Sequence, residues 1–202
     1  LARDAGLELP KQSEGDVQQY RKRTTLLDWA EKACAFFEDQ LRRPVGADAR
    51  EYLSKRGFGP EAWKRHRLGF APDGWRTLSD HLTKQGATLE DLIEAGLIVQ
   101  PEEAGKAPWD RFRNRVIFPI EDARGRTIGF GGRALAQDQE PKYLNTPESP
   151  VYRKREAFYG FPDALESIRR SGRAIVVEGY FDRIALARAG MGEALATCGT
   201  AL

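Results

Sequence analysis

The first half of the chain carries apolar residues at the spacing of helices. Between residues 24 and 41 apolar side chains recur every three or four positions, and Pro44 follows. Because this spacing places them on one face, it predicts an amphipathic helix that packs on a core and ends before Pro44. Two further helices are predicted, one over 49–56 with Gly57 as a left-handed cap and one near 89–95.

The pattern changes to alternation in the segment 111–120. Arginine occupies every second position there, at Arg111, Arg113 and Arg115, and alternate side chains of a strand share one face. The sequence therefore predicts a strand that projects three guanidinium groups together. A turn over 121–125 and a second apolar segment follow, which predicts a β-hairpin.

The last part of the chain has the order strand, helix, strand. After a predicted helix over 163–170, the β-branched run at 174–177 predicts a strand buried on both faces of a parallel sheet. A helix over 181–189 and a strand beginning within 193–197 complete the unit, while 141–152 is expected to be a long loop. The expected fold is an α+β part, with helices and a basic hairpin, leading into a βαβ unit.

Composition and charge narrow the class of protein. Among 202 residues, 32 basic and 30 acidic side chains leave a net charge of +2, which does not by itself indicate a nucleic-acid partner. The segment 106–133 nevertheless holds seven basic and three acidic residues. Two cysteines and two histidines without metal-ligand spacing argue against a zinc site or a disulfide framework. No apolar run suits a signal peptide or membrane span, so a cytosolic protein is expected.

The segment 177–182 holds the candidate chemistry. Glu178 ends the predicted strand, Gly179 lets the backbone turn, and Asp182 lies in the first turn of the next helix. Open α/β sheets bind ligands at this edge, where a carboxylate can hold magnesium or act as a general base. On spacing alone, the simpler interpretation is favoured, in which Glu178 hydrogen-bonds a loop and Asp182 starts a helix.

Consecutive motifs of the chain resemble bacterial, DnaG-type DNA primases. The stretch 175–186 resembles the first motif of the Toprim domain, which these primases share with topoisomerases and certain nucleases. Upstream segments resemble primase motifs in the same order, at 52–57, 68–72, 111–120, 125–133 and 141–148. The resemblance therefore spans essentially the whole chain.

This resemblance implies a DNA-templated RNA polymerase that makes RNA primers on single-stranded DNA from ribonucleoside triphosphates. It implies that Glu178 is a metal ligand or base for magnesium or manganese, and that Asp182 supports it. It also implies contacts with nucleotide phosphates and nucleic-acid strands for Arg56, Arg111, Arg113, Arg133, Lys142, Tyr143, Asn145 and Lys154. A solvated arginine face and a loop-anchoring Tyr143 are the structural alternatives.

The family pattern divides the chain into a linker over 1–20, a primase-core subdomain over 21–170 and the beginning of a Toprim domain over 171–202. Zinc is expected only in a preceding domain, and the replicative helicase contact only in a following one. An Asp-x-Asp pair that completes the metal site is expected beyond residue 202. The chain alone is therefore expected to be inactive but to keep its template- and nucleotide-binding surface, in a cytoplasmic replisome protein.

Several positions receive other interpretations. Phe181 and Arg183 depart from the family pattern, and Arg183 is expected to add a cation beside the acidic site. The glycines at 129–132 lack the context of a phosphate loop and are expected to permit a bulge or a close backbone approach. The four tryptophans are assigned to core or hinge packing, and His66 and His81 to the surface without a role.

Two other functions stay open. The first is a different Toprim enzyme, either a nuclease or a topoisomerase. The second is a non-catalytic module that binds single-stranded nucleic acid or a nucleotide, such as a guanosine alarmone, through the basic hairpin.

Overall fold

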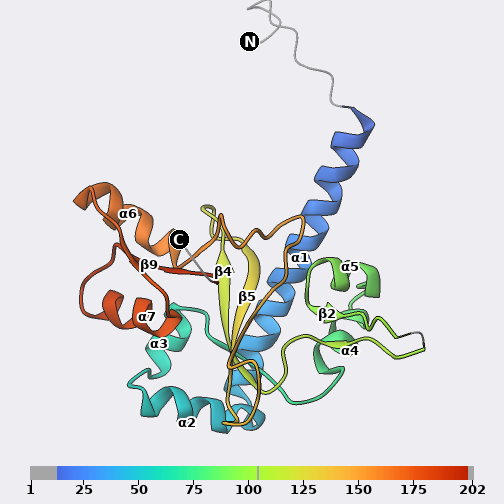
Figure 1. Cartoon of the computed structure of the whole chain (residues 1–202), viewed down its shortest axis with the longest axis horizontal. Helices are drawn as coiled ribbons and strands as arrows, with labels where there is room; N and C mark the ends of the chain where they lie inside the picture. The colour runs from blue at the N-terminus through green and yellow to red at the C-terminus, as the bar shows by residue number, and fades with distance from the viewer. Residues whose placement is uncertain (1–12, 104, 200–202) are drawn as a thin grey trace, which may run out of the picture.

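A long helix forms one side of the molecule. The computed structural model describes residues 13–103 and 105–199, and it begins with α1 (Glu14–Arg42). Figure 1 shows α1 running behind the central strands, with its first turns projecting beyond the body. The buried face of α1 carries Leu26, Ala33 and Phe37, each at most 1% exposed. The predicted amphipathic helix is confirmed.

The helix begins earlier than its apolar pattern indicates. Ser13 accepts a hydrogen bond from the backbone N–H of Asp16, and the Asp16 carboxylate accepts one from the Ser13 backbone. This reciprocal cap starts the helix, and the polar residues that follow it favour helix. Residues 14–20 of the expected linker over 1–20 are therefore helical, while residues 1–12 lie outside the described residues.

Short helices pack beside α1. The predicted segments 49–56 and 89–95 are helical, and Gly57 has the left-handed φ of 79° expected of its cap. None of the described helices is long and apolar enough to cross a bilayer. The short helical elements are η1 (Pro44–Gly46), α2 (Ala47–Lys55), α3 (Pro60–Arg65), α4 (Thr77–Thr83) and α5 (Leu89–Glu94).

A four-stranded antiparallel sheet lies at the centre, in the order β1-β4-β5-β6. Its strands are β1 (Gly69–Ala71), β4 (Arg115–Glu121), β5 (Thr127–Ala134) and β6 (Tyr143–Asn145). The predicted hairpin is confirmed as β4 and β5, and α1 packs against β1 and β5. The segment 141–152 is not wholly a loop, because Tyr143 pairs with Arg133 and begins an edge strand. A separate pair joins β2 (Ile98–Val99) to β3 (Trp109–Asp110).

The predicted row of arginines does not form. Strand β4 begins only at Arg115, because Asn114 adopts a left-handed φ of 50° that interrupts the extended backbone. Asparagine tolerates this conformation better than most residues. Arg115 lies inside the sheet and is 3% exposed, whereas Arg111 and Arg113 precede it outside the strand. The three guanidinium groups therefore do not share one strand face.

The glycines of β5 allow close packing, as the sequence predicts. A Cβ atom at Gly131 would lie 2.2 Å from the Tyr180 ring, and one at Gly132 would lie 2.7 Å from the Phe112 ring. The register of the hairpin shifts where Ile120 pairs with Gly129 but Glu121 pairs with Thr127, so Ile128 of β5 is the extra residue and Gly129 directly follows it. The glycines therefore allow close contact with aromatic rings of the core, and the first of them lies next to the bulge.

The C-terminal part contains a second, smaller sheet and two helices. The strands are β7 (Phe158–Tyr159), β8 (Ile175–Val177) and β9 (Ala194–Thr197), and the helices are α6 (Phe161–Ser171) and α7 (Tyr180–Arg188). The sheet order is β7-β9-β8, and β8 runs parallel to β9 across α7. The predicted strand–helix–strand unit is confirmed, and Phe118 of β4 packs on Tyr159 and Tyr180 to join the two sheets. The whole is an α+β fold.

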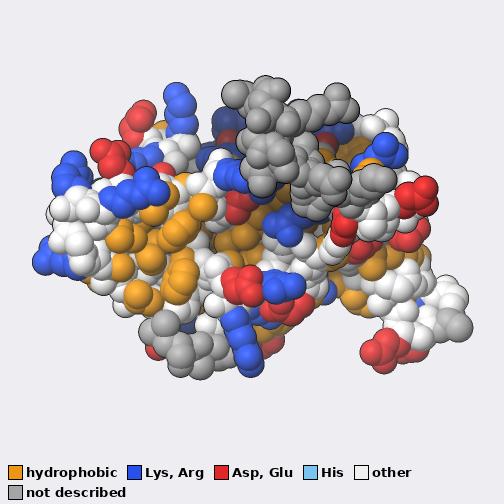
Figure 2. Space-filling view, turned by 90° about the horizontal axis from the view of Figure 1, so that it is seen from above, with side chains coloured by type: hydrophobic (Ala, Val, Ile, Leu, Met, Phe, Trp, Pro, Cys, Tyr) orange, Lys and Arg blue, Asp and Glu red, His pale blue; other side chains and the backbone are white. Residues whose placement is uncertain are grey.

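One expectation for this sheet is wrong. Strand β8 is not buried on both faces, since Val176 is 40% exposed. Among the described residues β8 pairs only with β9, so it is an edge strand here. Helix α6 is also partly uncovered, with Leu165 and Ile168 only half-buried. Figure 2 shows apolar side chains open to solvent at the end of the molecule where α6 lies.

Candidate functional site

A cavity of about 740 Å³ opens where β8 ends and α7 begins. Its wall includes Glu178 and Asp182 from that turn, and Tyr143 and Asn145 from β6. These two pairs are more than 30 positions apart in the sequence. The structure therefore brings two carboxylates beside two side chains for which the sequence analysis expects a nucleotide or nucleic-acid contact.

The turn that carries the carboxylates is closely packed. Gly179 is the N-cap of α7, and a Cβ atom on it would lie 2.4 Å from the nearer oxygen of Asp182. The Asp182 carboxylate thus folds back over the turn that follows Glu178. The helix dipole favours a negative charge at this end of α7.

Glu178 and Asp182 have the ligand type that a hard cation prefers, but two carboxylates are too few to form a complete metal site. Carboxylate oxygens are the ligands that magnesium prefers. Over residues 13–103 and 105–199, no group of three or more histidine, cysteine, aspartate or glutamate side chains is placed to hold a metal ion. Glu178 and Asp182 are therefore at most part of a metal site.

Hydrogen bonds hold the part of the cavity wall that β6 contributes. The Tyr180 hydroxyl donates to Asn145 Oδ1 at 2.8 Å, and the Asn145 side-chain amide donates to the Cys198 carbonyl oxygen. Tyr180 is 4% exposed, and this burial raises its pKa far above the usual range. The hydroxyl therefore stays protonated as a donor, and Asn145 has a fixed orientation at the cavity wall. Tyr143 packs edge-on against Tyr180, with 6.4 Å between ring centres.

Two guanidinium groups adjoin this wall. The Arg133 guanidinium carbon lies 5.3 Å from the centre of the Tyr143 ring and 5.7 Å from that of Tyr52. The Arg56 guanidinium carbon lies 4.8 Å from the same Tyr52 ring. Neither arginine forms an ion pair with any described residue. Uncompensated, forked donors of this kind suit phosphate oxygens.

Arg115 lies behind these groups and supports them. Its Nη1 atom donates to the carbonyl oxygens of Pro141 at 2.8 Å and Gly132 at 3.3 Å. These two residues directly precede Lys142 and Arg133. Burial, followed by repulsion from Arg133, lowers the pKa of Arg115. The buried cation therefore ties together the two segments that present positive charge.

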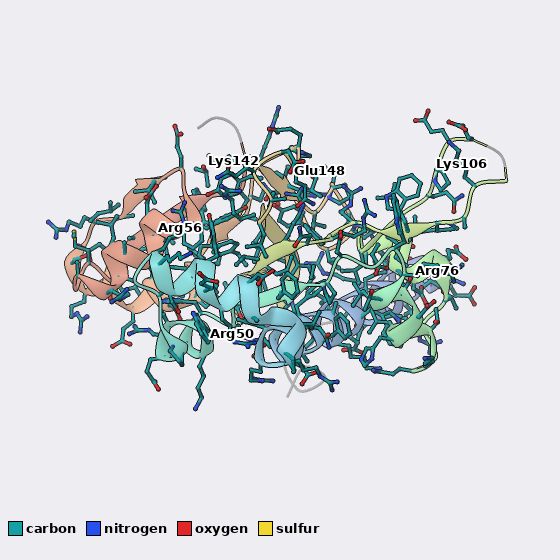
Figure 3. All side chains as sticks on the ribbon, turned by 90° about the horizontal axis from the view of Figure 1, so that it is seen from below. Arg50, Arg56, Arg76, Lys106, Lys142 and Glu148 are labelled. Carbon is teal, nitrogen blue, oxygen red and sulfur yellow. The ribbon has the colours of Figure 1, made fainter. Side chains whose placement is uncertain are left out.

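Lys142 and Lys154 occupy the rim. Both side chains are exposed, and Lys154 lies within reach of Gly199, which also lines the cavity. Figure 3 shows Arg56 and Lys142 at the same end of the molecule, away from Lys106 and Arg76. Four cations lie next to Tyr143 or Gly199 of the cavity wall or adjoin them through Tyr52, and they are named the basic rim below: Arg56, Arg133, Lys142 and Lys154.

A second cluster lies apart from the cavity. The Arg113 guanidinium carbon lies 3.4 Å from the centre of the Trp75 ring, which in turn packs edge-on against Trp109. Trp75 is 60% exposed, so its assignment to core or hinge packing is wrong. Arg111 is half-buried, and burial lowers its pKa. The structure therefore separates Arg111 and Arg113 from the other candidate residues.

Arg183 and His66 differ from their expected positions. Arg183, expected as a cation beside the acidic site, does not line the cavity and is 1% exposed, and His66, expected on the surface, is 6% exposed. They are in contact, with 3.2 Å between Arg183 Nη1 and His66 Nδ1. The helical spacing of Arg183 from buried Tyr180, three residues earlier, is the signal that indicates its inward position.

A family model, curated relatives and solved structures all indicate the same protein family. A family model described as the N-terminal domain of the DNA primase catalytic core matches residues 36–165. A DNA primase of Halalkalibacterium halodurans is 42% identical over all of this chain, which covers 34% of that relative. The chain thus spans about a third of the length of the curated relatives it matches.

Solved structures agree in both fold and sequence. The RNA polymerase domain of Mycobacterium tuberculosis primase DnaG is 40% identical, with a TM-score of 0.83 over 89% of this chain and 58% of that one. A DnaG primase catalytic domain bound to single-stranded DNA is 42% identical, with a TM-score of 0.79 over 90% of this chain and 56% of that one.

Proposed function

The chain belongs to the DNA primase family, and from that premise we propose that it forms the part of a DNA-templated RNA polymerase that holds the incoming nucleotide and the template. One observation carries the proposal. The cavity is lined by Glu178 and Asp182 together with Tyr143 and Asn145, and it adjoins guanidinium groups that have no acidic partner among the described residues. Such a site combines phosphate binding with carboxylates for phosphoryl-transfer chemistry.

We infer that β8, α7 and β9 begin a Toprim domain. The parallel pairing of β8 with β9 across α7, with Glu178 directly after the first strand, supports this assignment. In the whole protein, Glu178 would contribute a ligand for magnesium or manganese, or act as a base, with Asp182 in support. The bound cation would supply charge stabilisation during phosphoryl transfer, and its other ligands would come from outside the described residues.

The basic rim is proposed to bind the triphosphate of a ribonucleotide. Arg56 and Arg133 offer forked donors, while Lys142 and Lys154 add mobile positive charge at the edge. Tyr143 presents an aromatic face that is 43% exposed beside them, which suits stacking or a hydrogen bond to the nucleotide. Asn145 would orient the bound molecule from the cavity wall.

The cluster of Arg113 and Trp75 is proposed to contact the template strand. An exposed aromatic ring with a guanidinium on its face is a stacking surface for unpaired bases, and stacking tolerates any sequence. The relative solved with single-stranded DNA supports a template of this kind. Arg111, half-buried beside this cluster, would add positive charge for the backbone of the strand.

The remaining partners follow from the family. We propose that the whole protein acts in the cytoplasm at the replication fork, where it extends an RNA primer and contacts the replicative helicase through another domain. A zinc-binding domain would precede the core, as in the Aquifex aeolicus primase solved with its zinc-binding domain. A guanosine alarmone would compete for the basic rim.

Template-directed synthesis by the full-length protein tests the proposal. With a single-stranded DNA template, ribonucleoside triphosphates and magnesium, we expect short RNA products that require both the template and the ribonucleotides. Strand cleavage without ribonucleotides would favour a nuclease or topoisomerase of the Toprim class. Binding of nucleotide and DNA without either reaction would favour a non-catalytic module.

A further inference from the structure

We propose that Arg183 is a positioning residue for the acidic turn that carries Glu178 and Asp182. The inference rests on the proposed function, since it assigns to Arg183 the placement of the carboxylates in the cavity. Arg183 itself is 1% exposed and is not among the residues that line the cavity.

Arg183 joins four separate parts of the fold. Its Nε atom lies 3.3 Å from the Ala194 carbonyl oxygen, and its Nη2 atom lies 3.0 Å from the Gly160 carbonyl oxygen. Nη2 also lies 3.2 Å from Asp163 Oδ2, and Nη1 lies 3.2 Å from His66 Nδ1. These partners belong to β9, to the start of α6 and to the end of α3. One side chain in the first turn of α7 thereby contacts three other elements of the fold.

The backbone around Arg183 is shaped to admit it. Gly160, the N-cap of α6, has a left-handed φ of 79°, and a Cβ atom there would lie 2.1 Å from Arg183 Nε. The face of the Tyr159 ring lies 5.8 Å from the guanidinium carbon. A side chain other than glycine at position 160 would therefore displace the guanidinium as well as strain the turn.

The charge of Arg183 is compensated by one carboxylate. Asp163 is its acidic partner, and the imidazole of His66 together with the guanidinium of Arg183 lowers the pKa of Asp163. A buried guanidinium loses strong hydration, so its hydrogen bonds to fixed acceptors must be well formed. Breaking these hydrogen bonds would leave a buried charge without partners at a high cost in free energy, so Arg183 holds the elements that it contacts rigidly.

The hydrogen bonds of Arg183 help to position the turn that carries Glu178 and Asp182. Ala194 begins β9, which pairs in parallel with β8, and Glu178 follows β8 directly. The bond from Arg183 to the Ala194 carbonyl therefore fixes α7 against the same sheet that presents Glu178. In the basic rim, Arg133 lies on β5, and Lys142 and Lys154 lie in the segments around β6. Arg56 follows α2, and its guanidinium carbon lies 5.0 Å from the centre of the Phe181 ring in α7. Because three of the four cations lie away from α7, loss of Arg183 is expected to misplace the carboxylates with little effect on nucleotide binding.

The test uses the full-length protein with Arg183→Met, Arg183→Lys and the control Arg173→Met. Arg173 pairs with Glu193 next to the same sheet, but it is exposed. For Arg183→Met we expect kcat of templated synthesis to fall by about ten- to a hundredfold, because small displacements of reacting groups are costly. KM and the directly measured nucleotide Kd should stay within about twofold. Arg183→Lys should recover part of kcat, and Arg173→Met should leave it unchanged.

Two kinetic outcomes overturn the inference. A folded Arg183→Met protein with the kcat of the unchanged protein would do so, as would equal losses in nucleotide affinity and kcat. If Arg183→Met does not fold, Arg183→Lys decides by the same comparison. Hydrogen–deuterium exchange gives a readout that needs no activity: exchange should become faster at 178–183 in the variant but not at 111–121. Absence of synthesis by the unchanged protein contradicts the proposed function, whereas unchanged exchange at 178–183 contradicts the role of Arg183.

Discussion

The guanidinium of Arg113 covers one face of the Trp75 ring at 3.4 Å, while the ring keeps 60% of its surface exposed. If this pair stacks on unpaired bases, Trp75→Leu should weaken the binding of single-stranded DNA by about 1–3 kcal/mol. Fluorescence anisotropy with a labelled oligothymidine measures the effect. Arg124→Met, at the exposed tip of the hairpin, is the charge control for this experiment. Equal affinities of the Trp75 variant and the unchanged chain would rule out stacking there.

Arg115→Met should weaken the binding of a ribonucleoside triphosphate. The variant removes the bonds that hold the Pro141 and Gly132 carbonyls, and with them the placement of Lys142 and Arg133. Loss of hydrogen bonds from a charged donor corresponds to about a tenfold weaker Kd. Calorimetric titration of the folded variant measures this change, with Arg126→Met as the control. A Kd equal to that of the unchanged chain would show that Arg115 plays no part in the binding surface.

Gly131→Ala should destabilise the chain. The added methyl group would lie 2.2 Å from the Tyr180 ring, so the ring or β5 must move, which typically costs about 1–3 kcal/mol. The matched control is Gly59→Ala, where a Cβ atom meets nothing within 4 Å. Urea unfolding of both variants gives the difference in the free energy of unfolding. Similar midpoints for the two variants would contradict the close contact between Gly131 and Tyr180.

The stability that Asp163 contributes should disappear in acid. Contacts with His66 and Arg183 lower the pKa of Asp163 below its ordinary value of 3.8, so the folded chain favours the ionised form. This contribution is fully present above the pKa of the unfolded chain and is lost as the pH falls through the lower folded value. The difference in unfolding free energy between the unchanged chain and Asp163→Asn should thus be constant near pH 5 to 7 and shrink below about pH 4. A difference that grows in acid would contradict this assignment.

The sequence predicts the elements better than the positions of their charged side chains. The hairpin and the parallel strand–helix–strand unit follow from periodicity, because their apolar patterns agree with the final packing. The arginine alternation fails as a strand pattern because a single residue, Asn114, adopts a left-handed conformation. Periodicity alone does not reveal such a local backbone choice.

Contacts between distant residues are the other part that the sequence does not reveal. His66 and Arg183 are 117 positions apart, and no sequence motif indicates that they are in contact. The cavity itself also depends on tertiary packing, since Tyr143 and Asn145 reach Glu178 only through the contact of two sheets. The sequence therefore predicts most of the candidate residues singly, and the fold decides which of them meet.

Glu178→Gln in the full-length protein tests the central claim most directly. Glutamine keeps the size of the side chain and removes its charge, so the fold and the basic rim should be unaffected. We expect templated RNA synthesis to fall by about a hundredfold or more, as for the loss of a catalytic acid–base group. Nucleotide and single-stranded DNA affinities should stay within about twofold. Synthesis by Glu178→Gln at the rate of the unchanged protein would contradict the account.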